Sequence, residues 1–316
     1  MLTLTLITVF TLLVQCISVT GKGPRPLVLW HGLGDSYASP GMLEFVQLIK
    51  GVHPGIFVHS VYISEKLEDD RKAGFYGNVN EQIALVADQL ASIPELEGGF
   101  DALGFSQGGQ FLRAYVERYN TPQVHNLITF GSQHMGISDI PVCARYDFLC
   151  QVARRAAKGA VYGGWAQNNL VQAQYFRDPT NYKTYLEANH FLTSINNERP
   201  DARNATYANN LASLNKLVLV LFTEDKTVVP KESSWFGSEP VPEDDSGSGS
   251  VSQQLLSIEK QIIPMRLQPL YKEDWIGLRK LDERGDVVLE TCQGEHMEIG
   301  ECWERIVRGF AGGQMG

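Results

Sequence analysis

Apolar positions along the chain follow two patterns, short continuous runs and longer stretches in which every third or fourth residue is apolar. The short runs are typical of buried strands, and they lie at residues 26–30, 55–63, 100–105, 127–130 and 216–222. The spaced pattern predicts helices at residues 79–93 and 111–119. Because strands and helices alternate, the sequence predicts an α/β fold with a mostly parallel central sheet.

The carboxyl-terminal part of the chain has a weaker pattern. Residues 275–281 and 286–290 predict either a short hairpin or a helix followed by the last strand. Residues 303–310 predict a closing helix.

Residues 132–211 interrupt the alternation, because they contain no strong strand pattern. We expect a largely helical insertion between core strands, placed to overhang the edge of the sheet as a lid or acyl-chain groove. Its large apolar residues form either the wall of that groove or the core of the insertion itself. The candidates are Trp165, Leu170, Val171, Tyr175, Phe176, Phe191 and Leu192.

Residues 1–21 are almost wholly apolar but short for a membrane span, so we expect a secretory signal peptide cleaved between residues 18 and 22. An uncleaved anchor is the alternative, because a basic first region and an AxA cleavage site are both missing. No later run reaches membrane-spanning length. We therefore expect one mature domain, residues 22–316, without a transmembrane segment.

Charge and composition narrow the class of protein. The 316 residues are 43% apolar, which is enough for a large core. The chain has 27 basic and 36 acidic residues, a net charge of −9, and no long Lys/Arg cluster. Nucleic-acid binding is therefore not expected. Residues 237–254 are acidic and rich in glycine, serine and proline, which predicts a flexible surface loop.

Removal of a signal peptide would leave four cysteines, which fits disulfides in an oxidising compartment. Three connectivities are possible, and the sequence-local one joins Cys143 to Cys150 and Cys292 to Cys302. A zinc site is the alternative, although CxxC spacing is missing. Asn204 begins a sequon, NAT, which predicts an exposed glycosylated loop. We expect no cofactor and no metal.

One serine lies between glycines where an apolar strand meets a helix. Gly104, Ser106 and Gly108 match GxSxG, the pattern of a nucleophile elbow. A sharp turn there would hold the serine in a strained backbone conformation, and side chains at the flanking positions would collide with neighbouring chain. A glycine-rich structural turn is the alternative reading.

Two backbone amides are candidates for an oxyanion hole. Gln107 opens the helix after Ser106, so its amide would face an oxyanion formed beside the serine. An early strand ends in the glycine-rich turn HGLGD, where the amide of Leu33 is the second candidate. An ordinary strand-to-helix turn would explain the same glycines.

A serine hydroxyl needs an imidazole to take its proton and a carboxylate to hold that imidazole. Asp225 follows the strand at residues 216–222, and His296 follows the last predicted strand, in the order Ser, Asp, His. Glu224 and Glu295 are the rival acids. Among the other histidines, His134 and His190 fall in the insertion, where a structural role is expected.

With these residues assembled, the chain resembles the palmitoyl-protein thioesterases, a lysosomal α/β-hydrolase family. The resemblance runs through HGLGD, GFSQGGQFLRA, NLITFGSQHMG, LVQAQYFRDP, WFG and GEH, across most of the chain. It implies removal of long-chain fatty acyl groups from cysteines of S-palmitoylated proteins or peptides. It also implies that Ser106, Asp225 and His296 form the triad, that Leu33 and Gln107 supply the oxyanion amides, and that the acyl groove lies against the insertion.

The chain departs from the family pattern in places. Leu33 stands where methionine is common, and Glu295 stands before the base where aspartate is usual. The acidic stretch at residues 237–254 is extra, and the pair Cys292 and Cys302 has no clear counterpart.

Two other functions remain open on the residues alone. A secreted lipase or carboxylesterase would use the same groups on oxygen esters. A lipid-binding protein on an inactive hydrolase scaffold is more remote, because all three triad candidates are present. A signal peptide and the family resemblance together place the protein in the secretory pathway, in the lysosome or vacuole or outside the cell.

Overall fold

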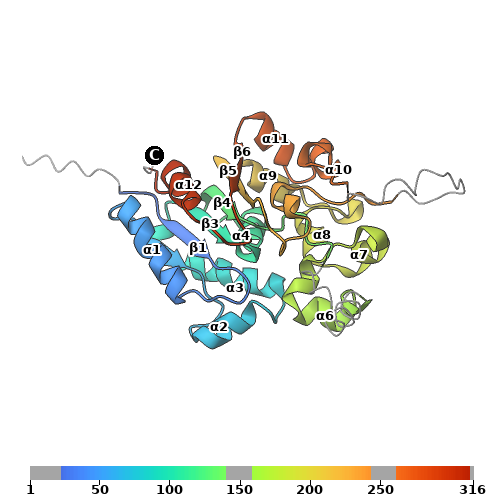
Figure 1. Cartoon of the computed structure of the whole chain (residues 1–316), viewed down its shortest axis with the longest axis horizontal. Coiled ribbons are helices and arrows are strands. Elements are labelled where there is room, and N and C mark those ends of the chain that lie inside the picture. Colours follow the sequence, from blue (N-terminus) through green and yellow to red (C-terminus); the bar gives the residue numbers. More distant parts are fainter. Residues whose placement is uncertain (1–22, 140–158, 243–260, 314–316) are drawn as a thin grey trace, which may run out of the picture.

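A six-stranded parallel sheet forms the centre of the computed structural model, which describes residues 23–139, 159–242 and 261–313 (Figure 1). The strand order is β2-β1-β3-β4-β5-β6, and each neighbouring pair is parallel. The strands are β1 (Leu27–Trp30), β2 (Val58–Ser60), β3 (Phe100–Phe105), β4 (Val124–Phe130), β5 (Lys216–Phe222) and β6 (Val287–Cys292). The predicted α/β fold with a mostly parallel sheet is confirmed.

Alternate strand residues enter two separate hydrophobic clusters, one on each face of the sheet. Leu27 and Leu29 pack with α1 (Pro40–Val52) and α12 (Cys302–Phe310), which lie together on one face (Figure 1). Val28 and Trp30 join the larger cluster on the other face. The helices that contribute to this second cluster are α3 (Val79–Ala91), α4 (Gln107–Arg118) and α9 (Ala205–Ala212).

The predicted bounds match β3 and β5 better than they match β4 or the edge strand β2. β3 and β5 begin and end where the apolar runs predict. β4 begins earlier, at Val124, because the polar residues His125 and Asn126 interrupt its apolar run although the backbone is already paired. At one edge, β2 is shorter than the predicted run, since only Val58–Ser60 pairs with β1.

At the carboxyl terminus, the structure decides between the two predicted alternatives. Helix α11 (Leu278–Glu283) precedes strand β6, so the hairpin reading is wrong. β6 is an edge strand with half-exposed residues, which explains why its apolar pattern is weak.

In its described part, the segment between β4 and β5 consists of short helices and turns. It contains α6 (Gly164–Asn169), η2 (Val171–Tyr175), η3 (Pro179–Asn181), α7 (Tyr182–Ala188), α8 (Leu192–Ile195), η4 (Pro200–Ala202) and α9. One short parallel bridge, between Ile137 and Phe176, ties this segment to the residues that follow β4. The other short helices are α2 (Leu67–Ala73), η1 (Pro94–Leu96), η5 (Lys231–Trp235), η7 (Met265–Leu267) and α10 (Pro269–Lys272).

Four sequence predictions fall wholly or partly outside the described residues. They concern the signal peptide at residues 1–21, residues 140–158 of the insertion, the pair Cys143 and Cys150, and most of the acidic loop. At the start of that loop, Ser238 exchanges two backbone hydrogen bonds with Ile263, of 3.1 and 2.8 Å. The backbone on the two sides of residues 243–260 is therefore paired.

Candidate active site

Ser106 occupies the sharp turn between β3 and α4. Its backbone has φ 51° and ψ −123°, a conformation that residues other than glycine rarely adopt. A β-carbon at Gly104 would collide with Gly109, and one at Gly108 would collide with the carbonyl oxygen of Trp30. The two glycines therefore let α4 pack directly against β1 and β3, with the serine between them.

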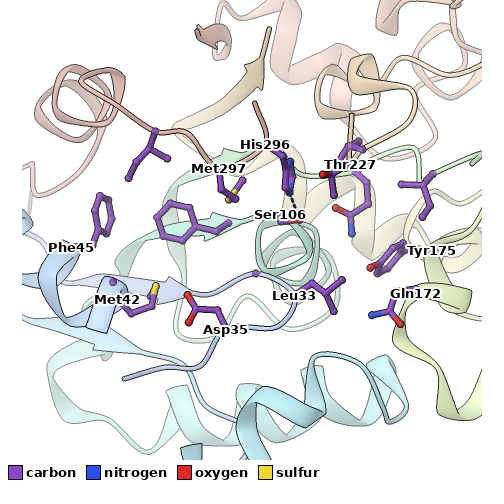
Figure 2. Close-up of a pocket in the computed structure, with 17 residues that line it drawn as sticks. Leu33, Asp35, Met42, Phe45, Ser106, Gln172, Tyr175, Thr227, His296 and Met297 are labelled. Carbon is purple, nitrogen blue, oxygen red and sulfur yellow. Dashed lines mark hydrogen bonds between the residues drawn. The ribbon is translucent and has the colours of Figure 1, made fainter. Parts of the chain in front are cut away.

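His296 lies between the serine and a carboxylate (Figure 2). Its Nε2 is 3.0 Å from the Ser106 Oγ, and its Nδ1 is 2.7 Å from the Asp225 Oδ2. With the proton on Nδ1, the ring donates to Asp225 and can accept the serine proton at Nε2. This arrangement can activate a hydroxyl for acyl transfer.

The Asp225 carboxylate is fixed by backbone as well as by the imidazole. Its Oδ1 accepts hydrogen bonds from the amides of Thr227 and Val228, at 2.8 and 3.0 Å, which leaves Oδ2 for His296. The neighbouring Glu224 is exposed. The second rival acid, Glu295, pairs with Lys226 at the surface, 3.0 Å away. Of the three carboxylates, only Asp225 contacts the ring.

Sheet topology explains why residues so far apart in sequence meet. Ser106, Asp225 and His296 follow β3, β5 and β6, whose carboxyl ends share one edge of the parallel sheet. A disulfide joins Cys292, the last residue of β6, to Cys302, the first residue of α12. The disulfide therefore links the two ends of the loop that carries His296.

The two residues predicted to supply oxyanion amides, Leu33 and Gln107, lie near the serine. Gly32 approaches Ser106 so closely that a β-carbon there would lie 3.3 Å from the Ser106 Cβ. Leu33 follows it and lines the same cavity. Gln107 is the first residue of α4, where backbone amides have no partner within the helix. Its side chain donates to the Gly74 carbonyl at 3.1 Å and accepts from the Tyr175 hydroxyl at 3.2 Å.

A cavity of about 490 Å³ opens at Ser106 and His296 and extends to both sides of them (Figure 2). One side, near α1, is lined by Met42, Phe45, Phe105, Met297 and Ile299, which belong to one hydrophobic cluster. The other side is lined by Gln172, Tyr175 and Thr227 (Figure 2), and Gln133, Ile137 and Val228 line the same cavity. Its volume suits a small or medium-sized ligand.

A second, mostly apolar chamber of about 510 Å³ shares Ile137 and Gln172 with the first cavity. Of the seven residues predicted for the groove wall, Tyr175 lines the first cavity, whereas Trp165, Leu170 and Phe176 line the second. The remaining three, Val171, Phe191 and Leu192, are fully buried in the hydrophobic core. These three residues therefore belong to the hydrophobic core and not to the wall of a groove.

Sequence patterns did not identify most of the residues that line the cavity at Ser106. Met297 and Ile299 follow the candidate base directly, and that position was the one available signal for them. Met42 and Phe45 occupy the inward face of α1 and read as ordinary core residues. Their contribution to the cavity depends on how α1 packs against the loop after β6.

Neither histidine of the insertion lines the cavity at Ser106. His134 is fully buried, stacks on Phe236 with ring centroids 4.8 Å apart, and has its Nε2 3.0 Å from the Thr129 hydroxyl. Burial, aided by nearby Arg113, lowers the pKa of His134 well below the usual value for histidine. His190 is exposed and does not line the cavity at Ser106.

Other predicted sites can be placed where the structure describes them. No cluster of three or more His, Cys, Asp or Glu suited to a metal occurs among the described residues. Within the same part of the chain, every helix is too short or too polar to span a bilayer. Asn204 is exposed at the start of α9, and its side chain accepts a hydrogen bond from the Thr206 amide at 2.9 Å.

Comparisons with known proteins agree with one another. Residues 26–296 match the family described as Palmitoyl protein thioesterase. Palmitoyl-protein thioesterase 1 of Caenorhabditis elegans is 39% identical over 275 residues, 87% of each chain. Palmitoyl-protein thioesterase 3 of Dictyostelium discoideum is 34% identical over 93% of this chain and 91% of its own. The lysosomal thioesterase PPT2 homolog of Drosophila melanogaster is 26% identical over 89% of this chain and 88% of its own.

Proposed function

The chain belongs to the palmitoyl protein thioesterase family and is a thioester hydrolase, and we propose that it removes long-chain acyl groups, palmitoyl above all, from cysteine residues of proteins or peptides. The observation that carries this proposal is the contact of His296 with both Ser106 and Asp225, beside an apolar cavity. No cofactor enters the proposed reaction.

In the first half-reaction, Ser106 attacks the thioester carbonyl while His296 takes the hydroxyl proton. The developing oxyanion is stabilised by the amides of Leu33 and Gln107. When the tetrahedral intermediate collapses, the carbon–sulfur bond breaks and His296 returns the proton to the leaving cysteine sulfur. The products are a free thiol and an acyl ester on Ser106.

In the second half-reaction, water attacks the acyl ester. His296 now takes a proton from the water and returns it to the Ser106 oxygen as the ester bond breaks. Asp225 holds the ring in the required tautomer and stabilises its charged form in both steps. The fatty acid leaves, and the free enzyme is restored.

We place the acyl chain on the insertion side of the cavity. The proposed path runs from Ser106 past Tyr175 to Ile137 and Gln172, which line both cavities, and on to the second chamber beside Phe176. Together the two cavities offer a longer apolar path than the α1 side, which is confined to the first cavity. Binding of a long chain becomes more favourable by about 0.8 kcal/mol for each methylene that it buries.

Gln172→Trp should narrow the passage between the two cavities. Because several methylenes would then lose their contacts, we expect kcat/KM for a palmitoyl thioester to fall by about tenfold to a hundredfold relative to an octanoyl thioester. Ile299→Trp is the matched control, since it fills the α1 side. A loss of palmitoyl preference in Ile299→Trp but not in Gln172→Trp would put the chain on the α1 side instead.

The proposed thioesterase activity is tested with two matched substrates, a peptide bearing palmitoyl on cysteine and the same peptide bearing palmitoyl on serine. We expect a higher kcat/KM on the thioester, because a thiol with a pKa of about 8.5 leaves with less help from a general acid than an alcohol does. Preferred cleavage of the serine ester would support the alternative function, a lipase or carboxylesterase. Binding of both peptides without turnover would support the lipid-binding alternative.

The proposal extends to cellular location. Relatives named lysosomal thioesterases, such as the Drosophila protein, favour a lysosomal or secretory route. The disulfide between Cys292 and Cys302 and the exposed sequon at Asn204 suit that route as well.

A further inference from the structure

Two buried groups lie behind the loop that carries Leu33. His31 directly follows β1 and is 3% exposed, and Asp70 of α2 is fully buried. The His31 Nε2 lies 3.2 Å from the Asp70 Oδ2, and the His31 Nδ1 lies 2.9 Å from the carbonyl oxygen of Gly32. Neither group takes part in the proton transfers described above.

Asp70 accepts hydrogen bonds from two other segments of the chain. Its Oδ2 accepts a hydrogen bond from the Tyr37 amide at 2.9 Å, and its Oδ1 accepts one from the Ile63 amide at 2.7 Å. Burial acts to raise the pKa of this carboxyl, but the contact with His31 and the two amide hydrogen bonds outweigh it, so the pKa lies below its usual value. Asp70 is therefore a fixed, ionised acceptor inside the protein.

Both neighbours of the His31 ring are acceptors, because a carbonyl oxygen and a carboxylate oxygen cannot donate. With a proton on Nδ1, the ring donates to the Gly32 carbonyl, and its Nε2 edge lies against the Asp70 carboxylate. The 3.2 Å contact with Asp70 limits how the ring can turn, and the ring contacts the Gly32 carbonyl through Nδ1.

The Gly32 carbonyl and the Leu33 amide belong to the same peptide group. A trans peptide is planar, so its carbonyl and its N–H point in opposite directions, and fixing one fixes the other. Gly32 also packs against Ser106, which puts this peptide group at the nucleophile. In residues 23–139, 159–242 and 261–313, the Leu33 amide donates to no protein acceptor, so it is available to a ligand.

We propose that His31 and Asp70 are positioning residues for the oxyanion hole: the ring, held by the carboxylate, turns the Gly32–Leu33 peptide so that the Leu33 amide faces the reacting carbonyl. This role rests on the proposed function, because it requires Leu33 to be an oxyanion donor. An amide turned away would stop stabilising the transition state, although substrate would still bind. The defect should therefore appear in kcat and not in KM.

Asp70→Asn removes the charge and one acceptor while keeping the side-chain shape. Loss of one oxyanion donor costs about 10²- to 10³-fold in kcat, and a misaligned donor should cost less, so we expect a fall of about tenfold to a hundredfold with little change in KM. His31→Gln should behave similarly. The kcat of the double variant should be no lower than that of the less active single variant, because both residues act through the same peptide group.

Asp101 provides a matched control at the opposite end of β3 from Ser106. It is also fully buried, accepts hydrogen bonds from two backbone amides, those of Asn126 at 3.1 Å and Gly312 at 3.0 Å, and faces a cation, Arg25, at 3.4 Å. Burial raises the pKa of Asp101 to about 6 despite Arg25, so assays at neutral pH compare two carboxylates that are mainly ionised. Asp101→Asn should leave kcat unchanged, whatever it does to thermal stability.

An oxyanion probe separates positioning from general damage to the fold. A long-chain alkyl trifluoromethyl ketone reacts with Ser106 when Oγ bonds to the carbonyl carbon, the carbonyl oxygen becomes the oxyanion, and the serine proton moves to His296. The matching secondary alcohol fills the same cavity without forming an oxyanion. We expect Asp70→Asn to weaken inhibition by the ketone about tenfold or more while inhibition by the alcohol stays within about twofold.

The outcome is decided by the ketone-to-alcohol ratio, which is the inhibition constant of the ketone divided by that of the alcohol. An unchanged ratio in Asp70→Asn, or an equal change in Asp101→Asn, would overturn the positioning role. Should Asp70→Asn fail to fold, His31→Gln is judged by the same ratio. Ser106→Ala keeps this test distinct from the proposed function: full turnover in that variant would refute the nucleophile, whereas an unchanged ratio with an inactive Ser106→Ala refutes only the positioning.

Discussion

Ser106→Ala should lower turnover of a palmitoyl-cysteine peptide by about 10⁵- to 10⁶-fold. The variant removes the oxygen that forms the acyl ester, and no other group at that position can replace it. The cavity and the disulfide are untouched, so palmitate binding and the thermal midpoint should stay close to those of the wild type. Steady-state hydrolysis, with thermal unfolding of both proteins, measures the effect.

A matched control is needed because serines are numerous and small changes near a buried turn can disturb folding. Ser132 is fully buried at the end of β4, yet it does not line the cavity at Ser106. Ser132→Ala should retain turnover within about tenfold, as expected for a modest packing change. If Ser106→Ala kept even a tenth of the wild-type rate, Ser106 would not be the nucleophile.

His296→Ala should cost a similar 10⁵- to 10⁶-fold in turnover, because the serine loses its base and the leaving sulfur loses its acid. Since Ser106 and His296 act as one unit through their 3.0 Å contact, the double alanine variant should be no slower than either single variant. The three variants are compared on the same thioester, at enzyme concentrations high enough to detect the residual rate.

His190→Ala is the control for the base, since His190 is exposed in the insertion and does not line the cavity. It should leave the rate unchanged. Additive losses in the Ser106 and His296 double variant would mean that the two residues act in separate steps. The proton transfer from Ser106 to His296 would then be refuted.

The sequence predicted the centre of the fold well because buried central strands have local signatures. β3 and β5 are paired on both sides, so apart from Asp101 and Lys216 near their amino ends they carry no charged or polar side chain, and the pattern matches the bounds. Edge strands lack that constraint. β6 carries Glu290 on a half-exposed face, which is why helix and hairpin could not be separated from the pattern.

Within the candidate site, residues that follow strand ends were predictable and cavity walls were not. Ser106, Asp225 and His296 each follow a strand of one parallel sheet, so their meeting depends on topology alone. The walls depend on which side of a helix faces which loop: Phe191 packs into the core, whereas Gln172 lines both cavities. Asp70 could not be found either, since nothing local links α2 to the Leu33 loop.

Identifying the residue that carries the acyl group tests the account most directly. A palmitoyl-cysteine peptide is mixed with enzyme, quenched with acid within the first turnover, and the digested protein is mapped by mass spectrometry. We predict palmitoyl on the peptide that contains Ser106, at a level that decays as fatty acid is released, and none in Ser106→Ala. Palmitoyl on any other side chain during turnover, or turnover with Ser106 unmodified throughout, would contradict the mechanism.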